Sequence, residues 1–268
     1  MNRIVVGVSF RSHWKALDAV AARLAHGANA EVVLTHVGAD RAAIEELRWD
    51  VSLLQDFRDQ DIGARLEWRQ GDPVVQLVAC VDEHAPAMLL VGASTVHDAR
   101  RGFLGSTTQR LIHQVTSPLV VVPTDMPIPR QDKPWRVVYA TDLSSDGLAG
   151  VDKALALAEA FQGELQVLHV VKGRHHGGLW SQTGDPSEGI SNAGKLAAAV
   201  EHIACETDFD PELIHVLSCP SVAYGILDEC ERLEADVIIL ATRAEDPNVS
   251  VAQAVLRLSE VPVCLLRR

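Results

Sequence analysis

The residues with the clearest chemistry lie between positions 92 and 108, where glycines and hydroxyl side chains separate two patterned runs. The run from Ala87 to Val91 is typical of a buried strand, and Thr107 to Gln114 is typical of a helix. Gly105 and Ser106 would then begin that helix, where backbone N–H groups have no acceptor within the helix. Together with the helix dipole, these donors favour an anion, most often a phosphate. The alternative is an ordinary strand–loop–helix connection whose Gly-Ser pair only caps the helix.

Composition limits the classes of protein to consider. The chain has 268 residues, of which 47% are apolar, and a formal net charge of -12. Such a surface repels nucleic acid and anionic lipid, so a bound anion has to be held locally. We find no apolar run near the ~18 residues of a membrane span and no signal peptide at the start. We therefore expect a cytoplasmic protein with no nucleic-acid or membrane partner.

The cysteines are scattered and lack CxxC spacing. This usage favours buried thiols in a reducing compartment over disulfides or a structural zinc site, so we expect no bound metal. The five cysteines are Cys80, Cys205, Cys219, Cys230 and Cys264.

The sequence contains an internal repeat, and a fold assigned without recognising such a duplication would be wrong. Two strand-like runs and one helical pattern recur after a shift of 133 positions. These pairs are Arg3 to Val8 with Arg136 to Thr141, 31–37 with 164–170, and Ser12 to Ala28 with Ser145 to Phe161. Later matches pair Gly71 to Pro73 with Ser218 to Pro220, Ala87 to Val91 with Asp236 to Leu240, and 118–122 with 262–266. The proline-rich segment 125–134 reads as a linker, which predicts domains at 1–124 and 135–268.

Within each half, short β-branched runs alternate with amphipathic runs. That order predicts an α/β fold with a parallel sheet covered by helices on both faces. Ligands of such sheets bind at the carboxyl ends of the strands, where the strand order reverses. The expected ends are Val8-Ser9 and Val91-Gly92 in the first half, and Thr141-Asp142 and Leu240-Ala241 in the second.

The two halves differ at these ends. The second half is five residues shorter in the region of the phosphate loop, has no glycine there, and carries Glu245 and Asp246, which would repel a polyphosphate. It keeps Asp142 where the first half has Ser9. A carboxylate at that position can accept hydrogen bonds from an adenine amino group or a ribose hydroxyl. One half thus keeps the phosphate loop and the other keeps the carboxylate.

Several histidines invite a catalytic or metal-binding role. The segment 172–190, placed before a helix starting near Ser191, reads as a mobile polar loop. Its pair His175 and His176 lacks further ligands at convincing spacing. His36 and His169 occupy the same place in both halves, which indicates packing or hydrogen bonding rather than catalysis. His97 and Asp98 read as polar surface of the loop.

With these motifs in view, the whole chain resembles a tandem member of the universal stress protein family. Nucleotide-binding members carry G-x2-G-x9-G-[S/T], and this chain reads Gly92-x2-Thr95-x9-Gly105-Ser106. The family's strand-Asp-x-Ser start survives at 142–144, and its Gly-Asp-Pro turn is similar to 71–73. Thr95 replaces a glycine, and a β-branched residue is poorly suited to positive φ.

The resemblance implies two tandem Rossmann-like domains of the adenine nucleotide alpha hydrolase-like kind, each with five parallel strands in order 3-2-1-4-5. It implies ATP or another adenine nucleotide, with Mg, in the crevice between strands one and four of the first domain. It also implies pairing of 119–122 with 263–266 as an internal pseudo-dimer, with a homodimer left open. The binding residues it implies are Ser9, Val37, Gly92, Thr95, Gly105, Ser106 and Thr107, and Arg100 or Arg101 would add charge.

We therefore expect a nucleotide-binding protein of the stress response with a regulatory role and an unidentified protein partner. One alternative is a nucleotide-free interaction scaffold, because Ser9 and Thr95 depart from the family pattern. A slow ATP hydrolase is the other alternative, although no Walker A lysine follows Gly105.

Overall fold

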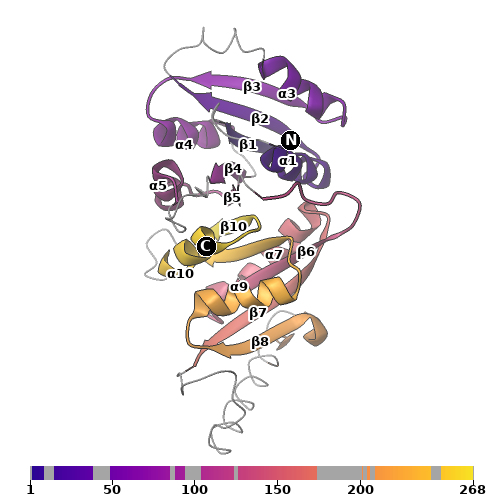
Figure 1. Ribbon diagram of the computed structural model, residues 1–268, viewed down its shortest axis with the longest axis vertical. Coiled ribbons are helices and arrows are strands. Elements are labelled where there is room, and N and C mark those ends of the chain that lie inside the picture. The colour runs from indigo at the N-terminus through magenta and orange to yellow at the C-terminus, as the bar shows by residue number, and fades with distance from the viewer. Residues whose placement is uncertain are drawn as a thin grey trace, which may run out of the picture.

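The computed structural model describes residues 2–8, 15–38, 49–84, 88–93, 104–123, 126–173, 201, 204–205, 209–242 and 249–267. Within these ranges ten strands form one sheet in the order β3-β2-β1-β4-β5-β10-β9-β6-β7-β8. The order 3-2-1-4-5 therefore occurs twice, which confirms the α/β fold expected from the repeat. Figure 1 shows the two halves stacked along the long axis, with β5 and β10 between them.

Both halves alternate strands and helices. The first contains β1 (Asn2–Val8), α1 (Lys15–Ala28), β2 (Ala30–Val37), α3 (Trp49–Arg58), β3 (Ala64–Arg69), α4 (Pro73–His84), β4 (Met88–Ala93), α5 (Ser106–Gln114) and β5 (Leu119–Pro123). The second contains β6 (Trp135–Thr141), α6 (Ser145–Leu148), α7 (Gly150–Ala160), β7 (Gly163–Lys172), the short 3-10 helix Pro211–Leu213, β8 (Ile214–Cys219), α9 (Val222–Arg232), β9 (Val237–Thr242), α10 (Val249–Leu258) and β10 (Val263–Arg267).

The helical pattern from Ser145 to Phe161 is confirmed as helix, but the structure divides it at Ala149 into α6 and α7. The buried Tyr139 hydroxyl donates to the Gly147 carbonyl over 2.6 Å, so a side chain takes an acceptor in the middle of the expected helix. The same hydroxyl lies 2.3 Å from where a Cβ on Gly150 would be, so glycine is required at this close approach.

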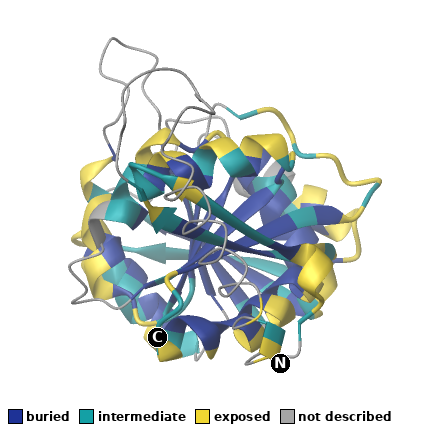
Figure 2. Ribbon diagram, turned by 90° about the horizontal axis from the view of Figure 1, so that it is seen from below, coloured by how far each residue is buried: buried dark blue, intermediate teal, exposed yellow. Residues whose placement is uncertain are grey.

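The helices form two layers, and each layer covers its own apolar core. Helices α1, α3 and α7 pack on one face of the sheet, and α4, α5, α9 and α10 pack on the other. Because the central strands are buried on both faces, they read as nearly continuous apolar runs. Figure 2 shows these strands buried in the centre, with the exposed residues on the outer sides of the helices.

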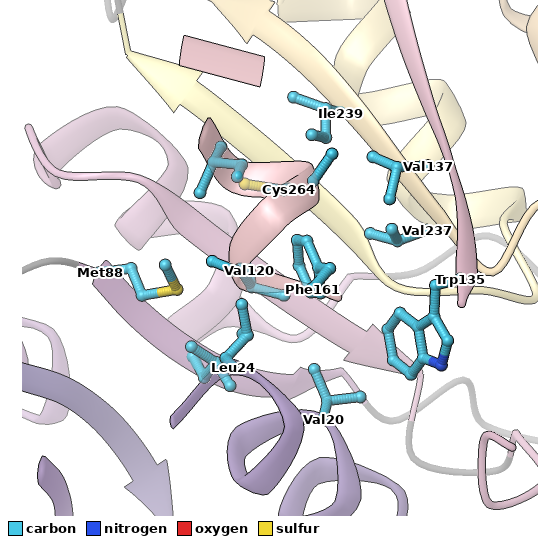
Figure 3. Packing of buried hydrophobic residues seen from close by; sticks show 14 of the residues in the cluster. Val20, Leu24, Met88, Val120, Trp135, Val137, Phe161, Val237, Ile239 and Cys264 are labelled. Atoms are coloured by element: carbon cyan, nitrogen blue, oxygen red, sulfur yellow. The ribbon is translucent and has the colours of Figure 1, made fainter. Parts of the chain in front are cut away.

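The two halves meet about a pseudo-two-fold axis. Strand β5 pairs antiparallel with β10, and Val120 lies opposite Cys264, its counterpart in the repeat. On one face of this strand pair α1 crosses α7, and Gly27 of α1 contacts Ala160 of α7, its counterpart in the repeat. Equivalent residues that face each other are the mark of an isologous contact. The expected pairing of the last strands is confirmed, and Figure 3 shows the side chains packed around it.

One buried arginine of α1 joins the two halves through hydrogen bonds. Arg23 is 3% exposed, and its Nε donates to the Phe161 carbonyl at 2.5 Å. Its Nη2 donates to the carbonyls of Lys133 and Gln162 at 2.8 and 2.9 Å. The guanidinium also lies over the Trp135 ring, 4.7 Å from its centroid. Arg23 therefore binds the linker and caps the C-terminal end of α7.

Candidate functional site

The order of the strands in the sheet reverses between β1 and β4. Strand β1 pairs with β2 on one side and β4 on the other, with Val8 opposite His36 and Gly7 opposite Val91. The helix after β1 covers one face of the sheet, and the helix after β4 covers the other. Such a topological switch point is where open α/β sheets bind their ligands.

Helix α5 begins at this edge of the sheet with backbone N–H groups to which no described residue offers an acceptor. Its N-cap is Gly105, which has no side chain to accept from the first turn. The first intrahelical bond runs from the Gln109 N–H to the Gly105 carbonyl at 2.9 Å, so the amides of residues 106 to 108 precede the helical ladder. Gly105 and Ser106 are exposed, whereas Leu104 and Thr108 are buried and anchor the turn. The arrangement presents amides and a positive helix end to an anion.

Asp72 fixes the helix that carries these donors. Its Oδ1 accepts from the backbone N–H groups of Val74 and Val75 and so caps α4. Its Oδ2 lies 2.7 Å from Arg110 of α5, and this arginine holds the pKa of the Asp72 carboxyl below its ordinary value. One side chain therefore joins the starts of α4 and α5. The sequence resemblance singled out the turn but not Arg110, whose pairing requires the folded chain.

His36 of β2 forms a hydrogen bond to the carboxyl end of β1. Its Nδ1 donates to the Val8 carbonyl at 2.8 Å, and its ring lies 4.8 Å from that of Trp68. Burial lowers the pKa of His36, so the neutral ring is favoured. His169 makes the same bond to the Thr141 carbonyl at 2.9 Å in the second half. The prediction that both histidines serve in packing or hydrogen bonding agrees with these contacts.

The carboxyl ends of the strands in the second half carry a different set of side chains. The Asp142 Oδ1 accepts from the Ser144 N–H and hydroxyl at 3.1 and 2.7 Å, and Ser144 caps α6. The carboxylate is thus held in place at the end of β6. Glu245 and Asp246, expected to repel phosphate, lie outside the described residues.

Arg267 connects this second edge with α5. It donates from Nη1 to Thr242 Oγ1 at 3.0 Å, at the end of β9. Its Nη2 donates to the carbonyl of Ile112 in the last turn of α5. A cation at this end of a helix is stabilising, so the second half contacts the C-terminal end of α5, whose N-terminal end belongs to the candidate site of the first half.

The structure describes five of the seven residues predicted to bind a ligand. Val37 and Gly92 lie at the carboxyl ends of β2 and β4, and Gly105, Ser106 and Thr107 begin α5. Ser9 and Thr95 lie outside the described residues, as do Arg100, Arg101, His97, Asp98, the His175-His176 pair and the expected helix near Ser191. None of the described helices combines the length and the hydropathy that a bilayer crossing requires.

The structure also gathers three residues that the sequence analysis did not group. Glu67, Cys80 and His84 bring a carboxylate, a thiol and an imidazole together on β3 and α4. The four-residue spacing of Cys80 and His84 was a signal, because it puts both on one helix face. Glu67 comes from a separate strand and has no such signal in the sequence.

Comparison with known proteins gives one family. The universal stress protein family model matches residues 39–123 and 135–267. A comparison with curated proteins gives no match.

Two solved structures are similar to the chain over its whole length. A functionally unknown protein from Pseudomonas aeruginosa PAO1 is 16% identical, with 100% of this chain and 92% of that chain covered and a TM-score of 0.73. A universal stress protein from Archaeoglobus fulgidus DSM 4304 is 19% identical, with 100% and 96% covered and a TM-score of 0.70. At these identities the likeness establishes the fold.

Proposed function

The chain belongs to the universal stress protein family, and from that premise we propose that its first half binds ATP or a related adenine nucleotide. The observation that carries the proposal is the start of α5, which presents free amides at the β1/β4 switch point. In this proposal the first half spans 1–124 and the second 135–268. The role is regulatory, in a cytoplasmic stress response, through a protein partner.

Gly105 supports a ligand close to the backbone. A Cβ built on Gly105 would meet no atom of the described residues within 4 Å, and its φ of -55° is one that any residue adopts. The packing of the protein therefore does not explain a glycine here, whereas a polyphosphate approaching the amides does. In this pose the phosphates lie against Ser106 and Thr107, and the adenine lies near the Val37 backbone.

The remaining groups that the structure describes at the site fit binding rather than hydrolysis. Asp72, the carboxylate beside α5, is already bound to Arg110 and to the α4 amides. The hydroxyls of Ser106 and Thr107 are oxygen ligands of the kind that Mg²⁺ takes alongside substrate phosphates. We therefore assign these residues to holding a nucleotide and give none of them a catalytic role.

The second half serves as the regulatory partner in this proposal. Arg267 bonds both to Thr242 at the second edge and to Ile112 of α5. A nucleotide that orders the start of α5 changes the set of states that this helix samples, and a bound protein can recognise that change.

A valine at position 105 tests the proposal. We expect Gly105→Val to lower the affinity for ATP at least about tenfold, roughly 1.4 kcal/mol of binding free energy, because the isopropyl group occupies the phosphate position. The measurement is isothermal calorimetry on the full chain, with the melting temperature as a check of folding.

Gly63→Val is the matched control. Gly63 precedes β3, at the amino ends of the strands and so opposite the site, and a Cβ there also meets no atom of the described residues within 4 Å. Both variants should melt near the wild type, and only Gly105→Val should lose ATP. Equal affinity in the two variants would refute the placement of the phosphates.

A further inference from the structure

A carboxylate, a thiol and an imidazole meet between β3 and α4, away from the proposed nucleotide site. The ligand atoms of Glu67, Cys80 and His84 all lie within 4.8 Å of one another. Glu67 Oε1 is 2.7 Å from His84 Nε2, and Glu67 Oε2 is 3.7 Å from Cys80 Sγ. We propose that these three side chains form a binding site for a divalent metal ion of the zinc class.

The fold places the three ligands by simple geometry. Cys80 and His84 are one helical turn apart, so they lie on one face of α4. Glu67 is on β3 opposite Thr35 of β2, and Thr35 Oγ1 contacts the Cys80 sulfur at 3.2 Å. The helix face therefore lies directly over the strand carboxylate, and Thr35 orients the sulfur as outer-shell groups of metal sites do.

The donor set matches the chemistry of zinc. Thiolate, imidazole and carboxylate are its three common protein ligands, and a fourth tetrahedral position is left for water. Magnesium and calcium prefer oxygen ligands alone, so the sulfur and nitrogen select against them. The site therefore fits a soft or borderline transition metal.

Two arginines beside Glu67 have other partners when a cation binds. Arg65 lies 3.3 Å from Glu67, but its Nη1 also bonds Glu31 at 2.8 Å. Arg69 lies 3.1 Å from Glu67, but its Nη2 also bonds Glu83 at 2.6 Å. When Glu67 turns toward a metal ion, each guanidinium keeps one carboxylate. The positive charges of Arg65 and Arg69, which would repel the ion, are therefore neutralised by Glu31 and Glu83.

An ion has a short path to this site. Cys80 is fully buried, whereas the side chains of His84 and Glu67 are 13% and 22% exposed. Binding replaces the His84–Glu67 contact with bonds from both groups to the ion. The Cys80 thiol proton, and any proton on the coordinating nitrogen, pass to solvent, and no oxidation occurs. The ion would thus lie just beneath the surface and join β3 to α4.

Titration of the full chain with Co²⁺, followed by Zn²⁺, tests the proposal. We expect one Co²⁺ per chain, visible absorption of a tetrahedral site, and a near-ultraviolet band from thiolate-to-cobalt charge transfer. Zn²⁺ should displace the cobalt and raise the melting temperature. Cys80→Ser and Glu67→Gln should each weaken Zn²⁺ binding at least about tenfold, and Cys80→Ser should remove the charge-transfer band.

Two controls distinguish this site from other metal-binding groups. Cys230→Ser removes a buried thiol of α9 and should leave binding unchanged. Changing both His175 and His176 to Gln should do the same. Circular dichroism without metal checks that every variant folds, and if Cys80→Ser does not, Glu67→Gln and the wild-type charge-transfer band decide. No metal uptake, uptake without the thiolate band, or loss of binding only in the histidine variant would overturn the proposal.

Discussion

At the scale of single residues, Asp18 in the first turn of α1 has an unfavourable environment for a charge. Its Oδ1 is buried, and no described residue donates a hydrogen bond to it. Burial, with a smaller effect of Asp56, raises its pKa from 3.8 to about 7. Between these values the folded chain holds a proton that the unfolded chain has lost. The free energy of unfolding therefore falls as the pH rises from about 4 to about 7.

Asp18→Asn should remove this pH dependence. We expect the substitution to stabilise the protein more at pH 8 than at pH 5, with a difference of about 2 kcal/mol. Urea unfolding at the two pH values measures it. Asp152→Asn, an exposed acid in the first turn of α7, is the control and should show no such difference. An equal effect of Asp18→Asn at both pH values would contradict the assignment.

Sequence and structure differ in what they show about individual side chains. The roles of His36 and His169 could be predicted, because the same residue at the same place in both halves indicates a shared structural contact, here the bonds to Val8 and Thr141. The state of Asp18 could not be predicted, because its burial and its neighbour Asp56 depend on the packing of α3.

At the scale of elements, the crossing of α1 and α7 depends on the absence of one side chain. A Cβ on Gly27 would lie 2.1 Å from the Ala160 carbonyl oxygen. Two helices can approach this closely only where one of them has no Cβ at the contact. Gly27 therefore sets the distance between the two halves on this face of the sheet.

Gly27→Ala should destabilise the protein by at least about 2 kcal/mol, because the helices have to separate or shift. In an exposed helix the same substitution stabilises by about 1 kcal/mol, so the sign of the change is diagnostic. Denaturant unfolding measures it, with Gly63→Ala as a control at an open position. Increased stability of Gly27→Ala would show that the crossing is not tight.

The elements themselves were largely predictable. β-branched runs and the repeat indicated the strands, and the family resemblance implied their order, which the sheet confirms. The break between α6 and α7 was missed because its cause is Tyr139, which reaches the Gly147 carbonyl from β6. The grouping of Glu67 with Cys80 was missed for the same reason, since contacts between elements leave no local pattern.

At the scale of the whole molecule, Arg23 couples the halves. Its guanidinium satisfies the carbonyls of Lys133, Phe161 and Gln162 from within α1. Arg23→Met would remove the donor to one buried and two part-buried carbonyls, of which, among the described residues, only that of Gln162 also accepts from a backbone N–H, that of Trp135. We expect this loss to destabilise the chain by about 2–4 kcal/mol. We also expect the variant to unfold in two transitions and the wild type to unfold in one.

Urea unfolding followed by two probes checks this prediction. Arg58→Met, at an exposed position in the last turn of α3, controls for loss of a positive charge. Arg23→Lys should rescue only in part, because an ammonium lacks the planar fork. Wild-type stability of Arg23→Met would show that the strand pair β5–β10 alone joins the halves.

The duplication could be predicted because it is a repeated pattern, and the pairing of the last strands because the family resemblance implies it. The fastening by Arg23 could not, since its counterpart in the repeat is Ala156, so the two halves are not equivalent at this contact. The start of α5 was predictable at Gly105 and Ser106, where local capping chemistry is visible. The contacts that hold α5 were less so, because Arg110 of α5 pairs with Asp72 and Arg267 of β10 donates to Ile112.

The most direct test of the central claim is a crystal structure of the full chain grown with ATP and Mg²⁺. We predict one nucleotide per chain, between the carboxyl ends of β1 and β4, with phosphate oxygens within hydrogen-bonding distance of the Ser106 and Thr107 amides. A nucleotide bound only between β6 and β9, or a first-half crevice filled by the protein's own side chains, would contradict it.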